Sequence, residues 1–220
     1  MEIFPEVVAF DYCISLGHSC DVANSLIDAC IRDASYPFDW CFTKVSKIKE
    51  FFENDFTNFF ERSNLIMSSG YVGHPASDKG GGIIYVHDGK FKELMRNDTF
   101  FEEQKNKYNR RVKRLYEKLN NDNNILFIHI LHPDAGTTDI FNLIETVSNK
   151  NFKSNIKFLI LSSKKDYTNL SNENVKFIRI QKTENIWEIV DILKKVKVVR
   201  HYRHRSHKIS AWKGSKKYNF

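Results

Sequence analysis

Several signals of common protein classes are missing from this chain of 220 residues. No apolar run approaches the roughly 20 residues that a membrane-spanning helix requires. The N-terminal residues MEIFPEVVAF contain neither a basic segment nor a long apolar one, so we predict no secretory signal. These absences favour a soluble protein of the cytoplasm, or of the host cytoplasm if the gene is viral.

Motifs for metals and nucleotides are also missing. The four cysteines include no Cys-x-x-Cys pair, which excludes a zinc ribbon as an interpretation. Without an export signal, disulfides are not expected either. The three glycines at 80–82 lack the Gly-x-Gly-x-x-Gly spacing and have no Gly-Lys-Ser/Thr after them, so we interpret them as a loop. We therefore predict no cofactor and no metal site.

Acidic residues are missing from the C-terminal region, where none follows Asp191. The last 29 residues carry ten Lys and Arg, whereas the rest of the chain carries 24 basic and 27 acidic residues, a net charge of −3. We expect a domain at residues 1–198 and a basic tail at 199–220. Because cations and aromatic rings suit phosphates and stacked bases, residues 194–217 are candidates for weak binding of nucleic acid or an acidic partner. An anionic membrane surface or a solubilising role are the alternatives.

The segments that are present alternate between strand and helix patterns. The composition, with 41% hydrophobic and 28% charged residues, is typical of a globular protein. The alternation predicts an α/β fold with a mainly parallel sheet flanked by helices in three layers. Residues 62–82 are interpreted as loop. Strands are predicted within VVAFDYCISLG, IIYVH, NILFIHIL, IKFLILSS and VKFIRIQ, with helices beginning near residues 21, 46, 100, 138 and 184.

Cys20 lies where the first predicted strand gives way to an amphipathic helix, in YCISLGHSCDVANSLIDACI. Gly17 marks a tight turn before it. A thiol at a helix N-terminus experiences the positive end of the helix dipole, which favours the nucleophilic thiolate. Backbone N–H groups at residues 19–21 are positioned to hold an oxyanion. We predict that Cys20 is a nucleophile; the alternative is a buried structural cysteine.

Three blocks of the sequence together resemble a known family. The segment ISLGHSCDVANSLI is similar to the Ser-Leu-Gly-x-x-Cys-x-x-Ala signature of the "putative papain-like cysteine peptidases", a domain family of unknown function. SYPFDW at residues 35–40 is similar to the second block of that family. HDGKF at residues 87–91 resembles the third, in which His-Asp-Phe is usual, although Gly89 and Lys90 intervene here. The order and spacing of the blocks also fit, over roughly residues 8–180.

The resemblance implies a thiol-dependent hydrolase that cleaves a peptide, isopeptide or related amide or ester bond. Cys20 is then the nucleophile and His87 the base, because His follows Cys along the chain of papain-like enzymes. The second block supplies Asp39 to orient the histidine, and Asp88 is the other candidate.

Other assignments stay open at this point. His18 and His132 are alternative bases, Asp134 is a lesser candidate for the orienting carboxylate, and His129 is interpreted as a core residue inside a strand. A parallel sheet differs from the helical and β-barrel lobes of papain-like enzymes, so an acyl- or glycosyl-transferase on a Rossmann-like fold is one alternative function. A non-enzymatic module that binds nucleic acid or an acidic partner through its basic C-terminus is the other.

Overall fold

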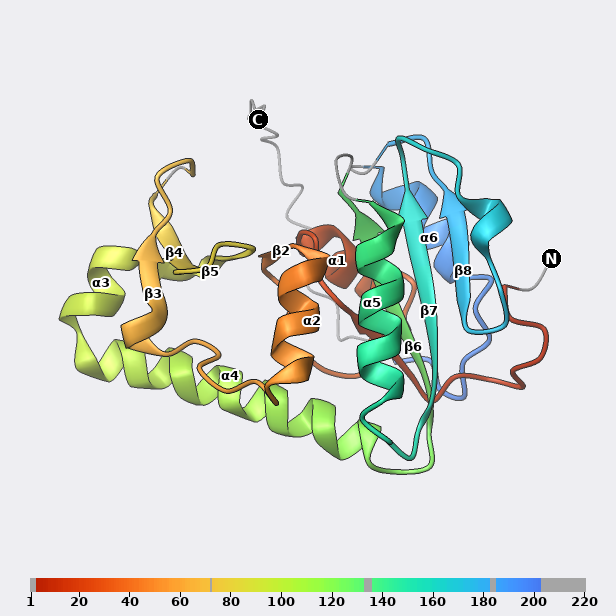
Figure 1. Ribbon diagram of the computed structural model, residues 1–220, viewed down its shortest axis with the longest axis horizontal. Helices are drawn as coiled ribbons and strands as arrows, with labels where there is room; N and C mark the ends of the chain where they lie inside the picture. The colour runs from red at the N-terminus through yellow and green to blue at the C-terminus, as the bar shows by residue number, and fades with distance from the viewer. Residues whose placement is uncertain (1–2, 72, 133–135, 183–184, 203–220) are drawn as a thin grey trace.

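The computed structural model contains a parallel sheet with helices on both faces and a second, antiparallel sheet beside it (Figure 1). It describes residues 3–71, 73–132, 136–182 and 185–202. The predicted fold class, α/β with a mainly parallel sheet flanked by helices, is confirmed. Most of the predicted basic tail, residues 203–220, and the candidate Asp134 lie outside the described residues.

The parallel sheet has the strand order β1-β6-β7-β8. Its central strands are continuous apolar runs, as expected for strands covered on both faces. In β6, every residue from 125 to 131 is buried. The four strands are β1 (Tyr12–Ser15), β6 (Asn124–Leu131), β7 (Asn155–Ser162) and β8 (Val175–Arg179).

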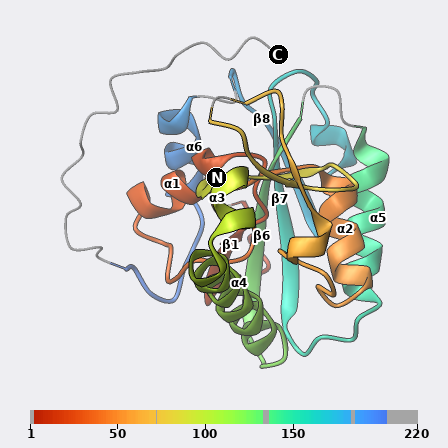
Figure 2. The ribbon, with the colours of Figure 1, turned by 90° about the vertical axis from the view of Figure 1, so that its left-hand side faces the viewer.

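Two pairs of helices cover the two faces of this sheet (Figure 2). On one face lie α1 (Cys20–Asp28) and α6 (Ile186–Leu193), which pack against each other. On the other face lie α2 (Val45–Glu53) and α5 (Thr137–Ser148), which also pack together. Each helix turns one apolar stripe to the sheet, so two apolar clusters form, one on each side of the strands.

The antiparallel sheet is the main departure from the sequence prediction. Its order is β2-β5-β4-β3, so the interpretation of residues 62–82 as loop is wrong. The strand predicted within IIYVH corresponds to β5, whereas β3 and β4 have only three and four residues and Pro75 begins β4, so these two strands show no clear alternating pattern. The elements are β2 (Phe42–Thr43), η1 (Arg62–Asn64), β3 (Leu65–Met67), β4 (Pro75–Asp78) and β5 (Ile83–Lys90).

A long helix joins the two sheets. After the short helix α3 (Phe91–Arg96), α4 (Asp98–Leu119) runs along the underside of both sheets in Figure 1. Tyr108 of α4 stacks on Phe60 with ring centroids 4.6 Å apart, and Phe60 meets Tyr85 of β5 edge to face. The last short element is η2 (Thr168–Leu170). Along the described part of the chain, no helix is both long and apolar enough to cross a bilayer.

Candidate functional site

The turn after β1 is locked against the segment that contains β2. Gly17 and His18 both have positive φ, +85° and +84°. The backbone N–H of His18 donates to Thr43 Oγ1 over 2.8 Å, and that hydroxyl donates to the carbonyl of Leu16 over 2.9 Å. Ser15 Oγ accepts from the N–H of Gly17 at 3.0 Å. The turn therefore has one defined conformation, held by Thr43.

Cys20 is the first residue of α1, as predicted. Ser19 is the N-cap, and its Oγ accepts a hydrogen bond of 3.2 Å from the N–H of Asp21. Of the three amides predicted to hold an oxyanion, the Asp21 amide is therefore already engaged. The Cys20 side chain is only partly buried, so its sulfur is not sealed in the core.

The ionisation of Cys20 differs from the prediction. Burial, the largest cause, and the Asp21 carboxylate raise the pKa of its thiol to about 11, although the backbone N–H of Cys20 opposes the shift. The expectation of a resting thiolate is therefore wrong, because desolvation outweighs the helix N-terminus. At neutral pH the residue carries a thiol, and chemistry at this sulfur needs a group that removes its proton.

Three imidazole rings gather at the carboxyl ends of β1 and β6. The His18 ring lies 6.0 Å from the His132 ring and 6.2 Å from the His129 ring, centroid to centroid. The parallel pairing of Ser15 with Ile128 brings these positions together, and this pairing cannot be read from either segment alone. Sequence reasoning considered each histidine separately and missed the cluster.

His129 is the buried member of the cluster, with 1% of its surface exposed. Burial, the largest cause, and the neighbouring His18 lower its pKa to about 3, although a hydrogen bond to the Leu16 backbone opposes the shift. Its Nδ1 has no hydrogen-bond partner among the described residues. The interpretation of His129 as a core residue agrees with this burial, and a ring held neutral is a poor proton acceptor at neutral pH.

His87 and Asp88 point in opposite directions from β5, as neighbours on a strand do. His87 is exposed, and its ring meets the Trp40 ring edge to face at 6.0 Å. Asp88 is buried and accepts hydrogen bonds from Tyr108 and Lys107 of α4. Asp88 is therefore bound to α4, away from the His87 ring.

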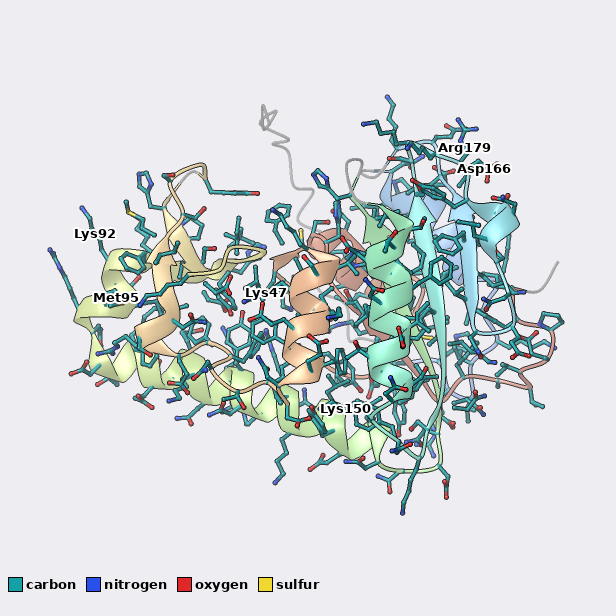
Figure 3. The ribbon with its side chains drawn as sticks, in the orientation of Figure 1. Lys47, Lys92, Met95, Lys150, Asp166 and Arg179 are labelled. Carbon is teal, nitrogen blue, oxygen red and sulfur yellow. The ribbon has the colours of Figure 1, made fainter. Side chains whose placement is uncertain are left out.

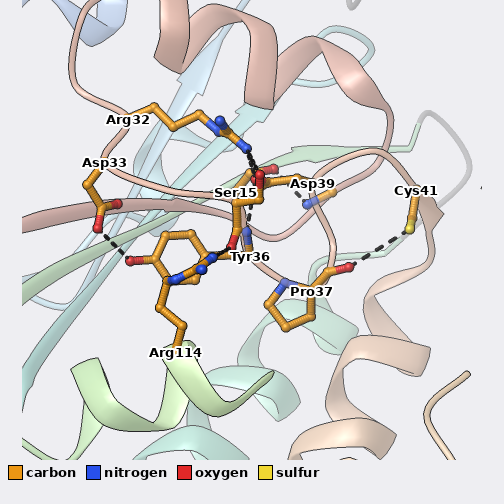
Figure 4. A network of polar contacts seen from close by, with 10 residues as sticks. Ser15, Arg32, Asp33, Tyr36, Pro37, Asp39, Cys41 and Arg114 are labelled. Carbon is orange, nitrogen blue, oxygen red and sulfur yellow. Dashed lines mark hydrogen bonds and ion pairs between the residues drawn. The ribbon is translucent and has the colours of Figure 1, made fainter. Parts of the chain in front are cut away.

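Asp39 forms a buried ion pair with Arg32, not with a histidine (Figure 4). The Arg32 Nη2 to Asp39 Oδ2 distance is 2.5 Å, and the N–H of Tyr36 donates to the same oxygen over 3.0 Å. Burial raises the pKa of Asp39, while Arg32, the Tyr36 N–H and Arg111 oppose this shift. Arg32 and Asp39 are in close contact, and the Tyr36 N–H also favours the charged form of Asp39. We therefore infer that Asp39 is ionised and that it holds the loop of residues 32–39 in place.

The three blocks of the sequence nevertheless meet in space. Thr43 follows the second block and accepts a hydrogen bond from the turn in the first block. Gly17 of the first block also lies close to the second, since a Cβ on Gly17 would be 3.0 Å from the Phe38 carbonyl oxygen. Trp40, in the second block, contacts His87 in the third. Cys20, the partly buried His18 and the exposed His132 therefore belong to a region that all three blocks help to build.

A comparison with protein-family models matches residues 11–162 to the family described as "Putative papain-like cysteine peptidase (DUF1796)". The chain belongs to this family. The family match ends at the last residue of β7, so β8, α6 and the basic C-terminal region lie beyond it. Comparisons with curated proteins and with solved structures found no match. The parallel sheet means that the family description refers to the residues and not to the two-lobed papain architecture.

The described residues contain no group of three or more His, Cys, Asp or Glu side chains arranged to hold a metal ion. The histidine cluster is not such a group. The glycines at 80–82 form the turn between β4 and β5, where the Lys44 N–H donates to the Gly82 carbonyl over 2.7 Å. Neither feature adds a ligand site to the region around Cys20.

Proposed function

We propose that this family member is a thiol-dependent hydrolase that cleaves a peptide, isopeptide or related amide or ester bond through Cys20. The observation that carries the proposal is a partly exposed thiol on the first turn of α1, behind a turn locked by Thr43 and beside a cluster of imidazoles. The family description supports the same coarse activity.

His18 is the proton acceptor that this arrangement supports best. It is two residues from Cys20 in the same turn, and its ring contacts His132 at the exposed edge of the sheet. The sulfur attacks the substrate carbonyl as its proton passes to the imidazole, and the proton then reaches the leaving nitrogen or oxygen when that bond breaks. Water hydrolyses the resulting thioester. His87 remains the alternative base predicted from sequence order.

Peptidyl inhibitors that alkylate a reactive thiol test this proposal. A peptidyl electrophile, such as an epoxysuccinyl or vinyl sulfone probe, is expected to label Cys20 in preference to the exposed Cys30. His18→Gln is expected to slow this labelling by about 10²–10⁴-fold, the usual effect of a lost general base. His87→Gln is the matched comparison. If His87→Gln slows labelling and His18→Gln does not, the base is His87; if no probe labels Cys20 in the folded protein, the proposal is overturned.

A second prediction follows from the raised pKa of Cys20 and concerns its reaction with a small reagent that does not resemble a substrate. Only the thiolate reacts with iodoacetamide, and the thiolate fraction rises about tenfold per pH unit below the pKa. The alkylation rate of Cys20 should therefore keep rising from pH 7 toward about pH 11. Mass spectrometry of the alkylated peptide measures this rate. A plateau below pH 8 would contradict the raised pKa and favour a preformed thiolate–imidazolium pair.

A further inference from the structure

The outward face of α6 combines one exposed aromatic ring with cations. Trp187 on the first turn is 69% exposed, which is unusual for a ring of this size. The other exposed positions are Asp191 on the helix and Lys194 and Lys195 just after its last residue. They follow Trp187 by four, seven and eight residues. At 3.6 residues per turn these positions share one face. Lys197 and Arg200 are exposed in the segment that follows the helix, which ends at Leu193. We call Trp187, Lys194, Lys195, Lys197 and Arg200 together the α6 face.

The charge of the α6 face is strongly positive. Lys194, Lys195, Lys197 and Arg200 are all exposed. Two acidic residues of α6 lie nearby: Glu188 is half-buried and accepts hydrogen bonds from the Gln181 N–H, and Asp191 lies 3.6 Å from Lys194 in a solvent-exposed ion pair. Such an exposed pair is weak, so it does not remove Lys194 from electrostatic contact with a polyanion. The sequence continues from this face into six further Lys and Arg and one further Trp, with no acidic residue.

We propose that the α6 face is a binding surface for single-stranded nucleic acid, with a base stacked on Trp187 and phosphates beside the lysines. This function is independent of the chemistry proposed for Cys20. Base stacking on an exposed aromatic side chain, flanked by cations that follow the backbone, is how proteins bind single strands without sequence preference. From Trp187 to Lys194 the helix rises about 10 Å, a length that two or three nucleotides span.

The buried side of α6 argues against a bilayer as the partner. A helix that lies in a membrane surface inserts an apolar face among the lipids. In α6 the apolar side chains Ile189, Val190 and Leu193 are buried against the parallel sheet and are not available for insertion. The exposed apolar side chains near these cations include Trp187 and Val199, which do not form the continuous apolar face that insertion requires, so the surface fits a nucleic-acid base better than a lipid layer.

Fluorescence anisotropy of a labelled oligo(dT) of about 15 nucleotides tests the proposal with the full chain. Trp187→Ala is expected to weaken binding about 5- to 150-fold, the usual effect of removing one stacking ring, and Trp187→Phe should recover most of it. The triple variant K194Q/K195Q/K197Q should reduce the slope of log K against log salt concentration by about 2, or about 0.7 for each lost phosphate contact.

One matched control lies at the far end of the molecule and another on the opposite face of the parallel sheet. The variant K90Q/K92Q/R96Q removes the same charge from the exposed surface around α3, where Figure 3 labels Lys92, and should leave the slope unchanged. Phe141→Ala removes a partly exposed ring from α5. The proposal is overturned if oligo(dT) does not bind, if binding depends only on residues 203–220 and not on the α6 face, or if the α6 face binds phosphatidylserine vesicles and not the oligonucleotide.

Discussion

Replacing Asp39 with alanine is expected to lower the free energy of unfolding by about 3–5 kcal/mol, because it leaves the Arg32 charge buried without its partner. Both side chains are almost fully buried, and they meet at 2.5 Å. The Tyr36 N–H also loses its acceptor. Urea unfolding followed by circular dichroism measures the change. Asp122→Ala, at an exposed position in a loop, is the control and should stay within about 0.5 kcal/mol of the parent.

A double-mutant cycle separates this structural role from the orienting role that the sequence suggested for Asp39. If Asp39 acts through Arg32, Asp39→Ala should cost much less in an Arg32→Ala background than in the parent protein. Labelling of Cys20 in the folded fraction should then change little. If the opposite is found, with full stability but lost labelling, Asp39 is part of the reacting site and the ion pair is secondary.

Gly17→Ala is expected to cost about 2–4 kcal/mol of unfolding free energy, from a strained backbone and a steric clash together. Gly17 has a φ of +85°, and a Cβ there would overlap Thr43 Oγ1 and lie 3.0 Å from the Phe38 carbonyl oxygen. Thr43 cannot move freely, because its hydroxyl bonds both His18 and Leu16. The same variant should also disturb Cys20, which the turn positions.

Gly73 provides a matched control for the backbone contribution. Its φ is also +85°, but nothing lies within 4 Å of the position that a Cβ would occupy. Gly73→Ala should therefore cost only about 1 kcal/mol, the strain of the left-handed conformation alone. Thermal unfolding of both variants gives the comparison. Equal losses at the two glycines would mean that the Gly17 turn can open away from Thr43 without penalty.

The parallel sheet was predictable because its strands have a strong local signal. The central runs NILFIHIL and IKFLILSS are apolar over a whole strand and are separated by one amphipathic helix. The antiparallel sheet was not predictable in the same way. β2 has two residues and β3 has three, so neither is long enough to show a period.

The candidate site was predictable only in part, because a side chain's partners depend on tertiary contacts. The position of Cys20 at a helix start follows from the local pattern, but its raised pKa comes from burial by the folded chain. The pairing of Asp39 with Arg32 and of Asp88 with Tyr108 likewise joins residues whose meeting depends on the fold. The adjacency of His18 and His132 follows once β1 is known to pair with β6.

The pairing of β1 with β6 also has a consequence for the order of assembly. Tyr12 lies opposite Ile125, so the first strand must wait during synthesis until the whole antiparallel sheet and all of α4 have left the ribosome. Contacts between such distant parts of a chain form slowly. The imidazole cluster near Cys20 therefore cannot form before β6 has been made, and a nascent or truncated chain that ends before β6 contains this cysteine without the cluster.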